Sequence, residues 1–154
     1  MKHGDIDAAL GLFGRVAAEG LWLGTEPGFD RQHYRDIFSR ALGLGNAMIV
    51  AEDGDALVGM MTTYEHVDYG WTIGMLVNES HRGLGIGRAM MEHLFAWANA
   101  RGIKELSLLV FPHNERALRL YRATGFTEVE RYANDVRRKS GDVWDTILMR
   151  KTLA

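Results

Sequence analysis

A glycine-rich turn between an expected strand and an expected helix constrains this chain more than any other segment. Residues 81–88 read His-Arg-Gly-Leu-Gly-Ile-Gly-Arg. Glycine lets the backbone turn tightly and approach a ligand closely, and the start of a helix offers unpaired N–H groups and a partial positive charge. The segment therefore predicts a site for a phosphate or pyrophosphate, with Arg82 and Arg88 adding formal charge. The competing interpretation is a flexible turn with solvated arginines.

The spacing of these glycines excludes the two common nucleotide-binding motifs. A P-loop requires Lys followed by Ser or Thr after its last glycine, but Arg88 and Ala89 stand there. The dinucleotide fingerprint G-x-G-x-x-G requires a third glycine at position 88, which is arginine. The pattern that remains is R-x-x-G-x-G, formed by Arg82, Gly85 and Gly87.

Composition is typical of one globular domain that covers residues 1–154, with 47% hydrophobic and 25% charged residues. The chain has no cysteine, which excludes a disulfide framework and a cysteine nucleophile. The histidines lack metal-ligand spacing, so we expect no metal. A net charge of −2, no signal peptide and no long apolar run predict a cytoplasmic protein that binds neither nucleic acid nor membrane.

Hydrophobic periodicity predicts a mixed α/β domain with the element order α-α-β-β-β-α-β-α-β-β. Helical patterns cover residues 6–19, 30–42, 88–100 and 114–124, and strand patterns cover residues 47–51, 57–63, 71–77, 105–111, 127–138 and 143–152. The link between the first two helices, residues 21–29, is unusually apolar for a loop. This indicates that the link packs on something or lines something.

The glycine turn and a second motif together resemble the GNAT superfamily of N-acetyltransferases. Residues 114–126 are similar to the family pattern N-x-x-A-x-x-L-Y-x-x-x-G-F, and the two motifs stand in the family's order. The resemblance covers roughly residues 47–153 and implies a central mixed β-sheet flanked by helices. The family begins with a short strand before the first helix. Here the helical pattern starts by Ile6, so we expect that first strand to be short or missing.

The resemblance implies an enzyme that moves an acetyl group from acetyl-coenzyme A (acetyl-CoA) directly to a primary amine of a small molecule, peptide or protein. It implies that the turn cradles the pyrophosphate and that the strand before it, splayed from strand 105–111, faces the acetyl carbonyl. The residues that it places at the cofactor are Met75, Leu76, Val77, Arg82, Gly83, Leu84, Gly85, Ile86, Gly87, Arg88, Asn114, Ala117 and Tyr121.

The resemblance also implies that Tyr121 donates a proton or a hydrogen bond to the departing thiolate, although its spacing with Ala117 and Leu118 equally fits a core tyrosine. The strand before the turn carries no carboxylate to act as general base. The candidates elsewhere are Glu26, Glu65, Asp68, Glu79 and His113, each of which also fits a solvated surface group. Glu26 is preferred because it lies in the apolar link, and a chain of water molecules is the alternative.

Trp22, Glu26 and Phe29 are the predicted wall of the acceptor site, because the family builds that wall from the first helix pair. Plain packing of an apolar loop is the alternative interpretation. The last strand pattern, with Ile147 and Leu148 among charges, predicts a surface for a homodimer. The missing carboxylate keeps a second function open, a non-catalytic domain that binds or senses acyl-CoA.

Overall fold

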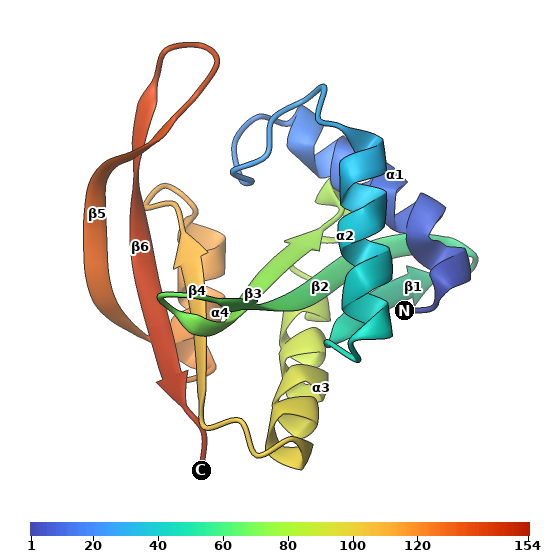
Figure 1. Cartoon of the computed structure of the whole chain (residues 1–154). Coiled ribbons are helices and arrows are strands. Elements are labelled where there is room, and N and C mark those ends of the chain that lie inside the picture. Colours follow the sequence, from blue (N-terminus) through green and yellow to red (C-terminus); the bar gives the residue numbers. More distant parts are fainter.

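Six strands form one mixed sheet in the order β1-β2-β3-β4-β6-β5, in a computed structural model that describes all residues, 1–154 (Figure 1). The strands are β1 (Met48–Asp53), β2 (Ala56–His66), β3 (Gly70–Val77), β4 (Glu105–Val110), β5 (Thr127–Arg137) and β6 (Val143–Thr152). All neighbours pair antiparallel except β3 and β4, which are parallel. The predicted mixed sheet is confirmed.

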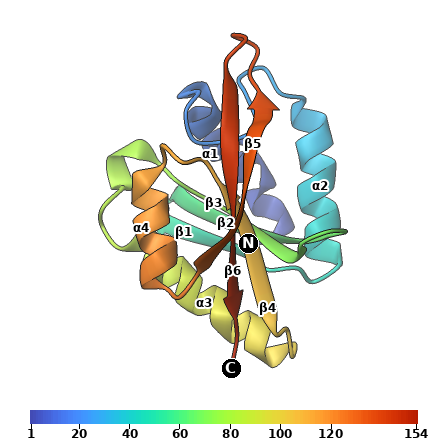
Figure 2. The ribbon, with the colours of Figure 1, turned by 90° about the vertical axis from the view of Figure 1, so that its left-hand side faces the viewer.

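Helices cover both faces of this sheet. They are α1 (Ile6–Ala18), α2 (Arg31–Gly43), α3 (Ile86–Ala100) and α4 (Glu115–Ala123), with 3-10 turns at His3–Asp5 and Glu79–His81. Seen along the sheet, α2 lies on one side and α3 and α4 lie on the other (Figure 2). Met60 packs with α1 and α2, and the next residue, Met61, packs with α3, because successive strand residues point to opposite faces. No helix combines the length and apolar character needed to cross a bilayer.

Local signals set the helix starts. Asp30 caps α2 by accepting hydrogen bonds from the backbone N–H groups of Gln32 and His33, and Asn114 caps α4 through Ala117. The third helix begins at Ile86, two residues before the predicted start. The reason is that Gly85 serves as its N-cap in the left-handed conformation, with a φ of +84°. The glycine turn therefore leads directly into the N-terminus of α3.

The chain has no strand before α1, as the sequence predicts. Residues 3–5 form a 3-10 turn instead, and the N-terminal amine of Met1 donates a hydrogen bond to the Met48 carbonyl at 2.7 Å. The prediction that the last strand offers a surface for a homodimer is wrong. Strand β6 lies between β4 and β5, and Ile147 and Leu148 are buried in the fold.

Strands β3 and β4 separate towards their carboxyl ends. Their only paired residues are Thr72 with Ser107 and Ile73 with Leu108, although β3 continues to Val77. The splay implied by the resemblance is therefore confirmed. It leaves backbone groups of β3 without a sheet partner on one side, just before the glycine turn.

Candidate active site

Two cavities meet where β3 and β4 diverge. The larger, of about 790 Å³, lies among the end of β3, the start of α3 and the helix α4. The smaller, of about 310 Å³, is bordered by strands β2 to β6. Both are lined by the same five residues, which we call the junction: Trp22, Leu23, Met75, Asn114 and Tyr121. The arrangement provides two compartments with one shared contact region.

Almost all residues predicted to hold the cofactor line the larger cavity. These are Met75, Leu76, Val77, Arg82, Gly83, Gly85, Ile86, Gly87, Arg88, Asn114, Ala117 and Tyr121. Leu84 does not line it, and this side chain is 69% exposed. No side chain caps the start of α3. The first N–H groups of this helix are therefore free to bind an anion in the cavity.

Gly87 allows the two motifs to come together. A Cβ atom at this position would lie 2.7 Å from Cδ2 of Leu120 in α4. Any larger residue would push Leu120, which itself lines the larger cavity. The glycine turn and the second motif thus share one cavity because α3 and α4 pack closely at this point.

The cations of the larger cavity differ in their availability. Its charged lining comprises Arg82, Arg88, Arg116 and Arg119 against Glu79 and Glu115. The guanidinium of Arg82 forms hydrogen bonds of 2.6 and 2.8 Å with Glu19 and one of 3.0 Å with the Val77 carbonyl. Arg82 therefore fastens the glycine turn to the end of α1. Arg119 lies 3.9 Å from the carboxylate of Glu115, whereas Arg88 and Arg116 form no ion pair. The arginines other than Arg82 still outnumber the two glutamates, and this excess of positive charge is suited to phosphates.

Glu19 links this anchor to the junction. Its carboxylate also accepts a hydrogen bond from Nε1 of Trp22 at 2.6 Å. The hydrogen bond from Arg82, together with that from Trp22, lowers the pKa of Glu19 below its usual value. The carboxylate is therefore ionised near neutral pH and holds the turn and the indole in a fixed relation.

Tyr121 is the only tyrosine that lines both cavities. It is 6% exposed, and burial raises the pKa of its hydroxyl to about 12. The hydroxyl therefore stays protonated at physiological pH and is able to donate a hydrogen bond to a ligand in either cavity.

The candidate bases lie in different places. His113 and Glu79 line the larger cavity, whereas Glu26, Glu65 and Asp68 line neither. Nε2 of His113 lies 2.7 Å from the Leu21 carbonyl. A carbonyl only accepts, so this nitrogen carries a proton, and in the neutral form of the ring Nδ1 is the acceptor.

The residues predicted for the acceptor wall are not brought together. Trp22 lines both cavities, but Phe29 packs 5.1 Å from the ring of Phe13 in the apolar cluster beneath α1 and α2. The carboxylate of Glu26 lies 3.7 Å from Nε of Arg138 and accepts hydrogen bonds from the backbone N–H of Lys139. It faces the β5–β6 hairpin and is engaged there.

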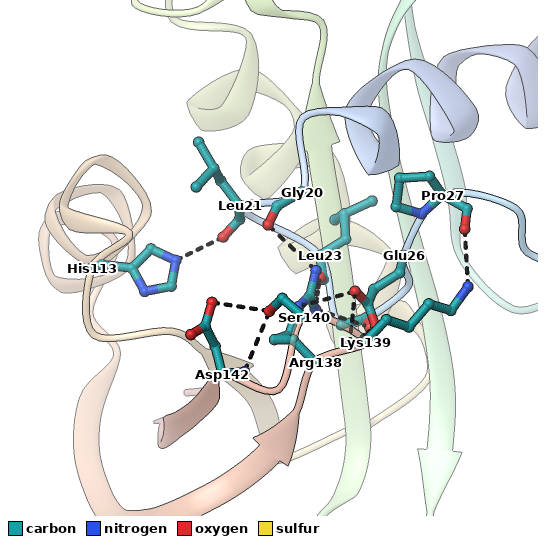
Figure 3. A network of polar contacts seen from close by, with 11 residues as sticks. Gly20, Leu21, Leu23, Glu26, Pro27, His113, Arg138, Lys139, Ser140 and Asp142 are labelled. Carbon is teal, nitrogen blue, oxygen red and sulfur yellow. Dashed lines mark hydrogen bonds and ion pairs between the residues drawn. The ribbon is translucent and has the colours of Figure 1, made fainter.

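Arg138, which the sequence did not single out, holds the apolar link in place (Figure 3). It is 4% exposed and donates hydrogen bonds to the carbonyls of Leu23, Gly24 and Gly20 at 2.8, 3.2 and 3.4 Å. Its guanidinium also lies 4.3 Å from the ring centre of Trp144. Together with His113 on Leu21, this network positions the link whose Trp22 and Leu23 form part of the junction.

The smaller cavity contains three further polar side chains that the sequence did not reveal. They are Tyr64, Asp135 and Thr146. Burial raises the pKa of Tyr64. The one available signal for this region was the Asn134-Asp135 pair inside a strand pattern, because Asn and Asp are the residues that tolerate left-handed backbone in a strand.

Comparison with known proteins agrees with this geometry. A sequence model described as "Acetyltransferase (GNAT) family" matches residues 17–126. YwnH of Bacillus subtilis (strain 168), provisionally named a phosphinothricin acetyltransferase, is 26% identical over 136 residues, which are 82% of this chain and 81% of YwnH.

Two solved structures share the fold over nearly the whole chain. A ribosomal-protein-alanine N-acetyltransferase from Brucella melitensis has a TM-score of 0.90 at 22% identity, covering 99% of this chain and 97% of its own. A phosphinothricin acetyltransferase from Sinorhizobium meliloti, in complex with acetyl-CoA, has a TM-score of 0.89 at 19% identity, covering 100% and 86%. The fold, the two motifs and the sequence match lead to one conclusion: the chain belongs to the GNAT acetyltransferase family.

Proposed function

We propose that the protein is an acetyl-CoA-dependent N-acetyltransferase that transfers acetyl directly to a primary amine of a small molecule, peptide or protein. The observation that carries the proposal is the junction, where a cavity lined by four arginines and a second cavity meet at a protonated tyrosine. The acetyl-CoA in the Sinorhizobium meliloti structure supports the choice of cofactor. The volume of the second cavity, about 310 Å³, suits a small amine or one side chain.

The residues of the larger cavity fit acetyl-CoA. The N–H groups at the start of α3 and the guanidinium groups of Arg88, Arg116 and Arg119 would bind its phosphates. The unpaired end of β3, from Met75 to Val77, would present backbone groups to its acyl arm. When bound, acetyl-CoA supplies the thioester that the amine attacks. Because the chain has no cysteine, the transfer cannot pass through an acyl-cysteine of this protein.

In this proposal Tyr121 stabilises the departing thiolate. Its pKa of about 12 exceeds that of an ordinary thiol, about 8.5, so complete proton transfer would be uphill by roughly 5 kcal/mol. The hydroxyl therefore acts mainly by donating a hydrogen bond to the sulfur as negative charge develops there.

We assign proton removal from the amine to His113 rather than to Glu26. His113 lines the larger cavity, its ring centre lies 6.0 Å from that of Trp22 at the junction, and its Nδ1 is free to accept a proton through water. Glu26 is engaged by Arg138 and Lys139, and in this proposal it fixes the apolar link against the hairpin.

The experiment is release of coenzyme A from acetyl-CoA in the presence of primary amines, followed with a thiol reagent. Amine-dependent release is the expected result. Binding of acetyl-CoA without release for any amine would favour the second candidate, a domain that binds or senses acyl-CoA. The observation behind that candidate is that no junction residue carries a carboxylate. If acetyl-CoA gives no thermal stabilisation where ATP or NAD does, both candidates fail.

A cytoplasmic location and a homodimer stay predictions. Sedimentation of the purified protein with and without acetyl-CoA measures the oligomeric state. A single monomeric species under both conditions would contradict the homodimer.

A further inference from the structure

The two cavities that meet at the junction differ in charge. Arginines outnumber carboxylates in the larger cavity. The smaller cavity is lined by one charged side chain, Asp135, and by no lysine or arginine. An anionic cofactor and a cationic acceptor would each find an opposite charge in their own compartment.

Asp135 is presented to the cavity by an irregularity in β5. Pairing with β6 shifts between Tyr132 and Val136, so that residues 133–135 lie opposite Asp145 alone. Within this bulge Asn134 has a φ of +53°, and its N–H donates a hydrogen bond of 2.9 Å to Asp145. Two hydrogen bonds from Arg131 hold that carboxylate in turn. Bulges of this kind redirect side chains beside active sites.

The carboxylate of Asp135 is oriented and still has acceptor capacity. Its Oδ2 accepts a hydrogen bond of 2.6 Å from Oγ1 of Thr146, a buried residue that lines the same cavity. An ionised carboxylate has about four acceptor sites, so the other oxygen is free for a ligand. Asp135 is an exposed residue that lines the smaller cavity alone, so it is not one of the five residues at which the two cavities meet.

From this arrangement we infer that Asp135 is a specificity-determining residue, which binds a second, positively charged group of the acceptor, so that the preferred acceptors are diamines or amines with a distant cation. The inference rests on the proposed function. An acceptor with a distant carboxylate finds no lysine or arginine in the cavity lining. Arg138, the buried arginine of the hairpin, is engaged by three carbonyls and by Glu26.

The test compares putrescine, butylamine and γ-aminobutyrate, which have similar chain lengths and carry a positive, a neutral and a negative distant group. At saturating acetyl-CoA we expect kcat/KM to be highest for putrescine and lowest for γ-aminobutyrate. Asp135→Asn should reduce the preference for putrescine over butylamine by at least about tenfold, the value of one hydrogen bond to a charged group. In Asp135→Lys, kcat/KM for γ-aminobutyrate should exceed kcat/KM for putrescine.

Asp142→Asn is the matched control, since it removes the same charge from an exposed position on the same hairpin and outside both cavities. It should keep the putrescine preference. Calorimetric binding of putrescine to the protein with coenzyme A gives a readout that is independent of turnover, and Asp135→Asn should weaken it by a similar factor.

The outcomes separate the two claims. If amines are acetylated without regard to the distant charge, or if Asp135→Asn keeps the wild-type preference, this inference is overturned and the proposed function stands. If no amine releases coenzyme A but putrescine binding depends on Asp135, the proposed transfer fails and the recognition site stands. If neither turnover nor putrescine binding is seen, both are overturned.

Discussion

Tyr121 borders both cavities and forms part of the junction, so its hydroxyl tests the proposed function at the scale of one atom. Replacing Tyr121 with Phe should lower kcat by about 10²–10³-fold, the usual cost of removing one hydrogen-bond donor from a developing negative charge, with little change in acetyl-CoA affinity. Since its pKa is about 12, the wild-type rate should show no loss from Tyr121 ionisation below about pH 11. Steady-state kinetics across pH and calorimetry with acetyl-CoA measure both.

Tyr132→Phe is the control for this variant, because Tyr132 lies on β5 and lines neither cavity. It should retain wild-type kcat. If Tyr121→Phe also retains it, the hydroxyl has no part in the reaction and Tyr121 is a core tyrosine.

A substitution at Gly85 tests whether the anion site depends on the left-handed backbone conformation of this residue. Its φ of +84° is one that residues with a Cβ rarely adopt, and no atom lies within 4 Å of a Cβ built there. Gly85→Ala should therefore cost about 1–2 kcal/mol of unfolding free energy through strain alone, and should weaken acetyl-CoA binding by distorting the start of α3. Urea unfolding and calorimetry give the two values.

Gly43→Ala, at the end of α2, serves as the comparison, because a Cβ also meets no atom there and its φ is not positive. It should change unfolding free energy by less than about 0.5 kcal/mol. Equal effects of the two substitutions would contradict a special role for the turn.

Among the elements, the β5–β6 hairpin and the apolar link depend on each other through Arg138. Arg138→Ala would remove the guanidinium that three carbonyls share, and would leave Glu26 with only the backbone N–H of Lys139. We expect a loss of about 3 kcal/mol in unfolding free energy, as for a broken buried ion pair. We also expect the KM for the amine to rise above its wild-type value by a larger factor than the KM for acetyl-CoA. Arg137→Ala, an exposed neighbour, should change neither quantity. Unchanged amine KM in Arg138→Ala would show that the network does not position the junction.

The elements themselves follow from local patterns, and this is why the sequence predicts them well. Periodicity and caps at Asp30 and Asn114 give the helices, and the two motifs give the cofactor cavity. The predicted start of α3 lies two residues too late, because Gly85 is the N-cap and has no side chain that would mark a cap in the sequence.

The acceptor side is harder to predict because its contacts join distant segments. Arg138 and Leu23 are 115 residues apart, and the bulge that presents Asp135 depends on Asp145 in the next strand. No spacing in the sequence connects these residues. The sequence accordingly placed Glu26 and Phe29 in the acceptor wall, where the structure gives them a hairpin contact and an aromatic packing contact.

At the scale of the whole molecule, stability should fall in acid. The hydrogen bond from Arg82 lowers the folded-state pKa of Glu19 below the ordinary 4.5. The backbone hydrogen bond from Asn134 and the side chain of Arg131 lower that of Asp145 below 3.8. A lowered folded-state pKa contributes stability that is complete above the unfolded value and is lost as pH falls through the folded value. The urea concentration at the midpoint of unfolding should therefore decrease as the pH is lowered below 4.5.

Glu19→Gln identifies the share of this acid sensitivity that belongs to the anchor of the glycine turn. Its stability should depend less steeply on pH in that range than the wild type, whereas Glu65→Gln, an exposed carboxylate on β2, should follow the wild type. Parallel pH curves for Glu19→Gln and the wild type would show that the Arg82 contact contributes nothing to folding.

The central claim is direct transfer of acetyl from acetyl-CoA to a primary amine at the junction. Mass spectrometry of a reaction that contains the protein, putrescine and acetyl-CoA with an isotopically labelled acetyl group tests it most directly. The predicted result is labelled N-acetylputrescine in amounts equal to the coenzyme A released, with the mass of the protein unchanged. Label that stays on acetyl-CoA for every amine supplied, or that appears only as acetate or on the protein, would contradict the claim.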